Sequence, residues 1–129
     1  ILYCCGLPRP SRLVLNNSFK RFSIEKISDL RHKLQLPETG FIDNAKAAKG
    51  LAQAKQATET DKYQEFYYQS VLARNLFFGH IFSSVLLTII IGCSWTLLLS
   101  ILIIAVLFCW QWWKMNLVYV KKIFIEYLK

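Results

Sequence analysis

The chain has 129 residues, with 16 Lys and Arg against 8 Asp and Glu and a net charge of +8. This length is too short for two ordinary domains. The basic residues are scattered among Ala, Gln and acids without a recognition motif, which argues against nucleic-acid binding. A basic balance of this kind instead favours contact with anionic lipid and a fixed orientation of a membrane segment.

Residues 1–24 form a basic leader without Asp or Glu, and the first acidic residue is Glu25. A basic, Ser-containing leader is typical of the end of a mitochondrial targeting segment, and an ordinary basic arm is the alternative. The chain begins with isoleucine rather than methionine, so we expect a processed or truncated start. Pro8 and Pro10 oppose helix formation, so residues 1–22 are expected to be irregular.

The rest of the polar region contains short predicted helices. The first covers about 24–36, after Ser23 as its N-cap, with apolar residues at helical spacing. Asp43 is expected to cap a second helix over 44–57, which is rich in strong helix formers. A third begins shortly before the apolar run. Helices this short are unstable alone, so residues 1–74 are expected to form a polar arm that docks on partners.

Residues 75–113 contain no Lys, Arg, Asp or Glu, which gives an uncharged run of 39 residues between Arg74 and Lys114. Of these residues, 21 are Leu, Ile, Val or Phe. At about −0.3 to −0.6 kcal/mol each, they favour membrane insertion by roughly 6–12 kcal/mol. Because one crossing needs roughly 20 apolar residues, the run is long enough for two short crossings or one very long one. We therefore predict an all-α membrane protein.

Two patterns in the run disagree about the number of crossings. Residues 92–96 are a mostly small or polar cluster, which predicts a transmembrane helical hairpin with arms 76–91 and 96–113, about 24 and 27 Å long. One continuous helix would instead carry a ridge of small and polar residues that lets another helix approach closely. We favour the hairpin, and we expect a bulky residue at Gly92 to push packed helices apart. The expected helix-packing residues are Ser84, Thr88, Gly92, Thr96 and Ser100.

The C-terminal segment, residues 114–129, carries its charges on one side of a predicted helix. Its broad apolar face favours an amphipathic helix that lies in the membrane interface. The alternative is a helix that continues out of the bilayer and packs on a partner. Aromatic and basic residues at the edge of a membrane segment anchor it in the headgroup zone. The expected anchoring residues are Arg74, Trp110, Trp112, Trp113, Lys114, Lys121 and Lys122.

Few residues are suited to catalysis. His32 and His80 are the only histidines, and no carboxylate lies in the apolar run. No phosphate-binding loop, nucleophile motif or Cys/His metal spacing occurs. His80 would need a second histidine from another subunit to ligate a haem. We therefore expect no enzyme activity, no cofactor and no metal site.

In general build, the chain resembles the small supernumerary subunits of mitochondrial inner-membrane complexes. The matching features are the acid-free leader, the Ala/Lys/Gln segment over 44–57 and the single apolar run. The resemblance implies a non-catalytic accessory subunit of a respiratory-chain or ATP synthase complex, acting in assembly and stability. Its partners would be other membrane subunits and lipids, including anionic lipid. The alternatives are a membrane-shaping hairpin protein of the endoplasmic reticulum and a small haem or electron-transfer subunit using His80.

Overall fold

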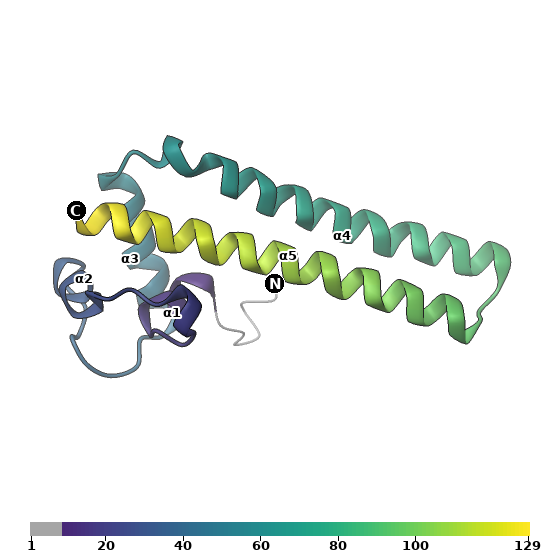
Figure 1. The fold of residues 1–129 in the computed structure, drawn as a ribbon, viewed down its shortest axis with the longest axis horizontal. Helices are drawn as coiled ribbons and strands as arrows, with labels where there is room; N and C mark the ends of the chain where they lie inside the picture. Colours follow the sequence, from purple (N-terminus) through teal and green to yellow (C-terminus); the bar gives the residue numbers. More distant parts are fainter. Residues whose placement is uncertain (1–8) are drawn as a thin grey trace.

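The structure, a computed structural model, describes residues 9–129. Every regular element in this part of the chain is helical, which confirms the predicted all-α fold. Two long helices form an antiparallel hairpin, and the shorter helices gather around the C-terminal half of the second one (Figure 1). The first residues of the basic leader, including Pro8, lie outside the described residues. The elements are α1 (Pro10–Leu15), η2 (Lys20–Phe22), α2 (Ile27–Lys33), α3 (Asn44–Ala57), η3 (Thr60–Tyr63), α4 (Gln64–Ile91) and α5 (Trp95–Leu128), where η denotes a 3-10 helix.

The turn of the hairpin is made by Gly92, Cys93 and Ser94, which confirms two helices rather than one. Gly92 has φ +93° and ψ 172°, a backbone conformation that is essentially open only to glycine. Ser94 then caps α5, because its side-chain oxygen accepts a hydrogen bond from the backbone N–H of Leu97 at 3.3 Å. The first helix of the hairpin ends at Ile91, as predicted.

α5 continues beyond the apolar run without a break, from Trp95 to Leu128. Residues 114–129 therefore do not form the separate helix that the sequence pattern predicted. Their apolar face is covered by the N-terminal helices of the same chain, so protein occupies the side that we expected to face the membrane interface. The alternative, a helix that continues and packs on a partner, describes α5 better, and the partner is residues 9–57.

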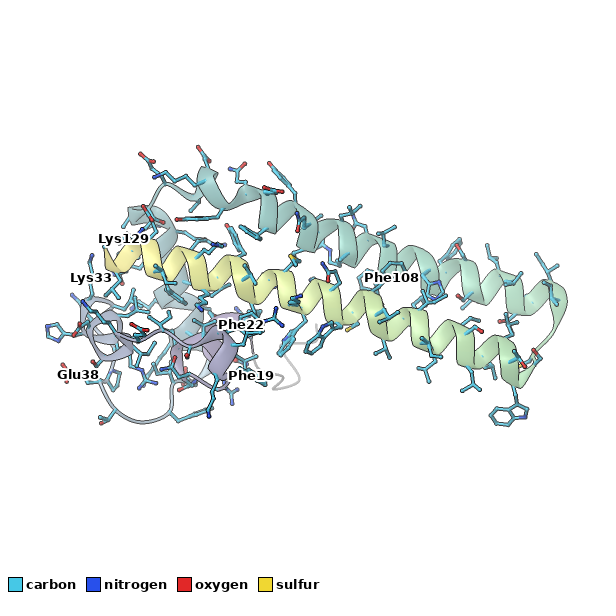
Figure 2. The ribbon with its side chains drawn as sticks, in the orientation of Figure 1. Phe19, Phe22, Lys33, Glu38, Phe108 and Lys129 are labelled. Atoms are coloured by element: carbon cyan, nitrogen blue, oxygen red, sulfur yellow. The ribbon has the colours of Figure 1, made fainter. Side chains whose placement is uncertain are left out.

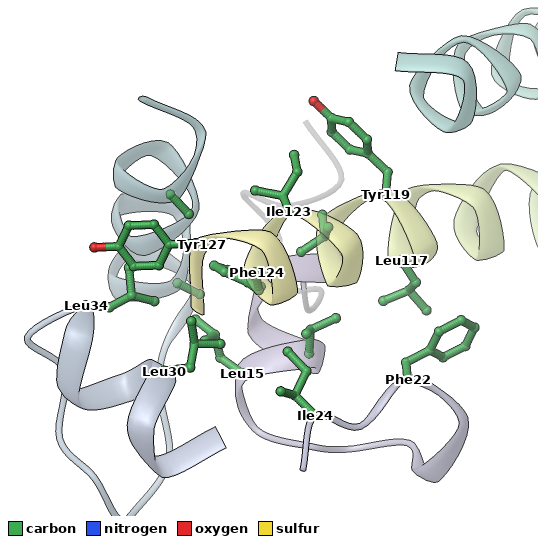
Figure 3. Close-up of a cluster of buried hydrophobic side chains, with 14 of the residues drawn as sticks. Leu15, Phe22, Ile24, Leu30, Leu34, Leu117, Tyr119, Ile123, Phe124 and Tyr127 are labelled. Atoms are coloured by element: carbon green, nitrogen blue, oxygen red, sulfur yellow. The ribbon is translucent and has the colours of Figure 1, made fainter. Parts of the chain in front are cut away.

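Residues 9–57 and the end of α5 share a hydrophobic core, and we call this unit the head. Leu117, Ile123 and Phe124 of α5 are fully buried against Leu15 and Leu30 of the shorter helices (Figure 3). Burying each such large side chain contributes roughly 1.5–3 kcal/mol. The other buried members of the core are Val14, Phe22, Ile24, Leu34, Ile42, Ala47, Ala54, Tyr119, Val120 and Tyr127.

The described part of the polar arm is folded rather than extended. α3 has the predicted bounds, and the carboxylate of Asp43 accepts a hydrogen bond from the backbone N–H of Lys46 at 2.9 Å. α2 is shorter than predicted and is not capped by Ser23, whose hydroxyl donates to the Lys20 carbonyl at 2.8 Å. The prediction of irregular backbone at Pro10 is wrong. Proline is tolerated in the first turn of a helix, where its missing N–H would have no partner.

A buried arginine joins separate segments of the head. Arg31 is 7% exposed, and none of the ion pairs among the described residues involves it. Its guanidinium donates to the carbonyl oxygens of Leu15 and Gly40, each at 2.8 Å. It also donates to the Asn16 side-chain oxygen at 3.3 Å, which in turn accepts from the backbone N–H of Ile42 at 2.9 Å. This network fixes the segment before α3 against the end of α1.

Replacing Arg31 by Ala is expected to lower the free energy of unfolding of the head by about 3 kcal/mol, because buried carbonyl groups lose their donor. The measurement is chemical unfolding in detergent followed by circular dichroism. Lys26→Ala, at an exposed position just before α2, serves as the control and should change stability by less than about 0.5 kcal/mol. Equal losses in the two variants would contradict a structural role for the arginine network.

Candidate membrane-facing surface

The hairpin is apolar on its outer sides between residues 75 and 113. Of the 24 exposed large hydrophobic side chains among the described residues, 19 lie in this stretch. Only Ser84 and Ala105 are buried there, and side chains project outward along both helices (Figure 2). Both α4 and α5 are long and apolar enough to cross a membrane. Exposed apolar surface of this extent marks a site of contact with lipid or protein.

α4 and α5 meet along a seam of small side chains. Ser70, Ala73 and Ser84 are buried on α4, and Ala105 is buried on α5. Half-buried residues fill the positions between them at intervals of three and four, the spacing of helices that pack nearly antiparallel. Small side chains let the two backbones approach closely. The seam therefore buries little apolar area and leaves most of the large side chains on the outside.

His80 lies in this seam. Its Nε2 atom is 3.1 Å from the carbonyl oxygen of Ile101 on α5, so it donates a hydrogen bond in the tautomer that carries the proton there. The ring also packs edge-on against Phe108, with 5.9 Å between ring centres. Hydrogen bonds between helices in lipid are worth about 0.6–1.7 kcal/mol. Because Nε2 is engaged with the backbone, we do not carry the haem-ligand hypothesis forward.

The turn splits the predicted helix-packing ridge into two parts. Ser84 and Thr88 lie in the seam, and their hydroxyls donate to carbonyls four residues earlier at 2.6 and 2.8 Å. Thr96 and Ser100 are exposed on α5, where the Ser100 hydroxyl donates to the Thr96 carbonyl at 2.9 Å. Since Gly92 reverses the chain, no continuous ridge forms along one face. Contact of Thr96 and Ser100 with a partner stays a prediction.

The two charged borders of the run lie at the same end of the hairpin. The ring centres of Tyr67 and Tyr119 are 5.5 Å apart across the two helices, and those of Phe78 and Trp112 are 6.4 Å apart. This antiparallel register places Arg74 level with residues 112–116 of α5, a stretch that includes Lys114. Both borders are therefore next to the head, and the turn at the opposite end carries no charge.

The other predicted anchoring residues have protein neighbours. Trp110 and Trp113 are in contact, with ring centres 5.3 Å apart. The ammonium group of Lys122 lies 5.3 Å from the ring centre of Phe66 on α4, and it therefore faces protein. Lys121 donates to the backbone carbonyl of Arg21 at 3.3 Å. The anchoring role of all seven predicted residues stays a prediction.

The sequence reasoning missed Phe19, whose ring packs edge-on against Trp113 with 5.4 Å between ring centres. Residues 19–22 read Phe-Lys-Arg-Phe, and this alternation of aromatic and basic residues was the available signal. Phe19 stands far from the apolar run in sequence, so only the folded head brings it to the base of the hairpin.

A second missed contact ties η3 to the end of α5. The hydroxyl of Tyr63 donates to the carboxylate of Glu126 at 3.0 Å, and Lys62 and Lys129 lie 3.8 and 3.5 Å from the same carboxylate. The hydrogen bond from Tyr63, together with the two cations, lowers the pKa of Glu126 below its usual 4.5. The same hydrogen bond raises the pKa of Tyr63 above 10.0.

A comparison of the chain with protein-family models, curated proteins and solved structures finds no match.

The contact between Tyr63 and Glu126 is expected to depend on pH. Since folding lowers the pKa of Glu126, its contribution to stability is present above pH 4.5 and is lost as the pH falls through the folded pKa. The midpoints of thermal unfolding of the unaltered chain and of Tyr63→Phe, measured in detergent, should therefore converge in acid. Tyr68→Phe is the control, because the Tyr68 hydroxyl donates to the neutral side chain of Gln64. A difference for Tyr63→Phe that stays constant with pH would contradict the assignment.

Replacing Gly92 by Ala is expected to destabilise the hairpin by about 1–3 kcal/mol, because a side chain strains backbone in this conformation. From the sequence we expected a bulky residue at Gly92 to push packed helices apart. The structure gives a different reason, backbone strain, because a Cβ atom at Gly92 would meet no atom within 4 Å. Gly79→Ala is the matched control, because it lies in open space within α4 and should be neutral or stabilising by up to about 1 kcal/mol. Unfolding in detergent measures both. A neutral Gly92→Ala would mean that the turn tolerates another conformation.

Proposed function

We propose that this chain is a non-catalytic accessory subunit of a multi-subunit membrane complex, inserted through the α4–α5 hairpin. The observation that carries the proposal is the combination of an uncovered apolar hairpin with an ordered head on the same helix. The hairpin needs an apolar environment that the rest of residues 9–129 does not supply. The head adds a folded surface outside that environment.

The dimensions support a hairpin that reaches across a bilayer. Residues 76–91 and 95–113 are uncharged and correspond to about 24 and 28 Å of helix, close to the roughly 30 Å of a hydrocarbon core. Both positively charged borders are next to the head, and Trp95 is 84% exposed at the opposite end. Basic residues on one side and an aromatic residue on the other are typical of a membrane protein with fixed orientation.

The continuity of α5 supports an assembly role. The same helix passes from the hairpin into the core of the head, so the head has a fixed position relative to the membrane segment. A rigid part of this kind can hold a neighbouring membrane helix and a neighbouring polar surface in one arrangement. We place the complex in the mitochondrial inner membrane, as a respiratory-chain or ATP synthase complex, because of the acid-free leader and the resemblance in general build.

A second candidate is a membrane-shaping hairpin protein of the endoplasmic reticulum. The observation that favours it is the uncharged turn, Gly92, Cys93 and Ser94, which lets the hairpin enter a bilayer without carrying a charged group through it. An ordered head of residues 9–57 packed on α5 is more than a wedge requires. We therefore rank this function second.

Native separation of the full chain in mild detergent, with identification of the proteins that co-migrate, tests the proposal. We expect a defined complex of membrane proteins. Thr96→Leu with Ser100→Leu should reduce the yield of that complex several-fold, because it replaces the two small exposed side chains on α5 that we expect a partner helix to contact. Ser83 is exposed on α4, and Ser83→Leu serves as the control. It makes a similar change at another place and should not reduce the yield.

Other outcomes contradict the proposal. Migration of the chain alone, together with tubulation of liposomes by the purified chain, would favour the membrane-shaping function. Recovery as a monomer without detergent would exclude insertion of the hairpin.

A further inference from the structure

We propose that the base of the hairpin binds one anionic phospholipid, in a site formed by residues 19–21 and the adjacent side of α5. The inference rests on the proposed insertion of the hairpin and adds a specific partner to it. The acyl chain would lie along α5, and the phosphate would lie beside the basic residues of the head.

The apolar half of the site is a hollow of about 380 Å³ on α5, lined by Val106, Cys109, Trp110 and Trp113. These side chains lie on one side of the helix and extend over two turns, about 10 Å. Val106 and Trp110 are 58% and 54% exposed, so no part of the described chain covers them. The hollow contains almost only carbon surface and lies on the apolar side of Lys114. An acyl chain is the occupant that matches this chemistry.

The head closes the hollow at its polar end. Phe19 packs on Trp113, and the ammonium group of Lys121 donates to the carbonyl of Arg21 at 3.3 Å. Leu117, one turn beyond Trp113, is buried and points toward Phe22 (Figure 3). Residues 19–22 are therefore held against α5 where the apolar surface ends. A lipid chain that follows the hollow reaches the basic residues of this loop.

The charges at this end favour an anion. Lys20 and Arg21 are exposed, and Lys114 is partly exposed. None of the three takes part in an ion pair among the described residues. The described ion pairs involve Glu59, Glu126 and Glu38, and Glu38 and Lys129 lie at the end of the molecule away from the turn (Figure 2). The nearest acidic residue in the sequence, Glu25, also forms no ion pair in the described chain, so a phosphate at the loop would meet cations that are not held by a carboxylate.

The experiment compares two lipids with bromine atoms in their acyl chains, phosphatidylglycerol and phosphatidylcholine, in vesicles that contain the full chain. Bromine quenches tryptophan fluorescence on contact, and Trp95→Phe with Trp112→Phe leaves Trp110 and Trp113 as reporters. We expect the anionic lipid to quench at a mole fraction lower by at least roughly 25-fold, since Lys20 and Arg21 would each contribute about a fivefold preference for anionic lipid.

Lys20→Gln with Arg21→Gln, in the same reporter background, should lower this preference by about 25-fold and leave only the contribution of Lys114. Lys46→Gln with Lys49→Gln is the matched control, because it removes the same charge from exposed positions on α3 and should retain the preference. All four substituted side chains are exposed, and matching circular dichroism spectra will show that the fold is retained.

Equal quenching by the two lipids in the reporter chain would overturn the site while leaving insertion intact. Equal loss of preference in both double variants would also overturn it, because net charge alone would then explain the effect. Quenching by neither lipid would contradict insertion of the hairpin itself, and with it the proposed function.

Discussion

The structure depends on one uninterrupted helix, α5, whose surroundings change along its length. From Trp95 to Trp113 it contacts α4 through a narrow seam, and most of its large side chains remain on the outside. Beyond Lys114 the same helix supplies Leu117, Ile123 and Phe124 to a closed core. Backbone hydrogen bonds inside the helix are satisfied in both stretches, as the proposed passage from lipid into water would require. The position of the head relative to the hairpin follows from this continuity.

The short helices of the head are stable because they pack together on α5. Each of α1, α2 and α3 is too short to be stable in isolation, and α3 buries mainly alanine and glycine. Their stability therefore comes from docking on α5 and from polar groups that satisfy one another. Arg31 illustrates the second contribution, since its guanidinium is buried, has no carboxylate partner among residues 9–129 and is satisfied by backbone carbonyls. Such an arrangement specifies one packing of the loops over the helices.

Several features of the fold could be predicted from local residue patterns. The Gly-Cys-Ser cluster predicted the hairpin, and Asp43 with its run of helix formers predicted α3, because both signals are local. The prediction failed where distant segments pair. No local pattern shows that residues 9–57 cover the apolar face of residues 114–129, so this face was assigned to the membrane interface. In the same way, Pro10 was interpreted as a helix breaker, although at the start of α1 it fits the geometry. Phe19 was overlooked because its partner, Trp113, is separated from it by most of the chain.

The sequence by itself determined the apolar character of this protein, because an uncharged stretch of 39 residues between two basic borders has to leave water whatever its packing. It also determined the helical class and the position of the turn, since glycine conformation and capping act within a few residues. Only the tertiary structure decided which apolar surface faces outward and which is covered by the head. Burial depends on contacts between residues far apart in the chain, and hydropathy alone does not distinguish a side chain that faces lipid from one that faces a neighbouring helix.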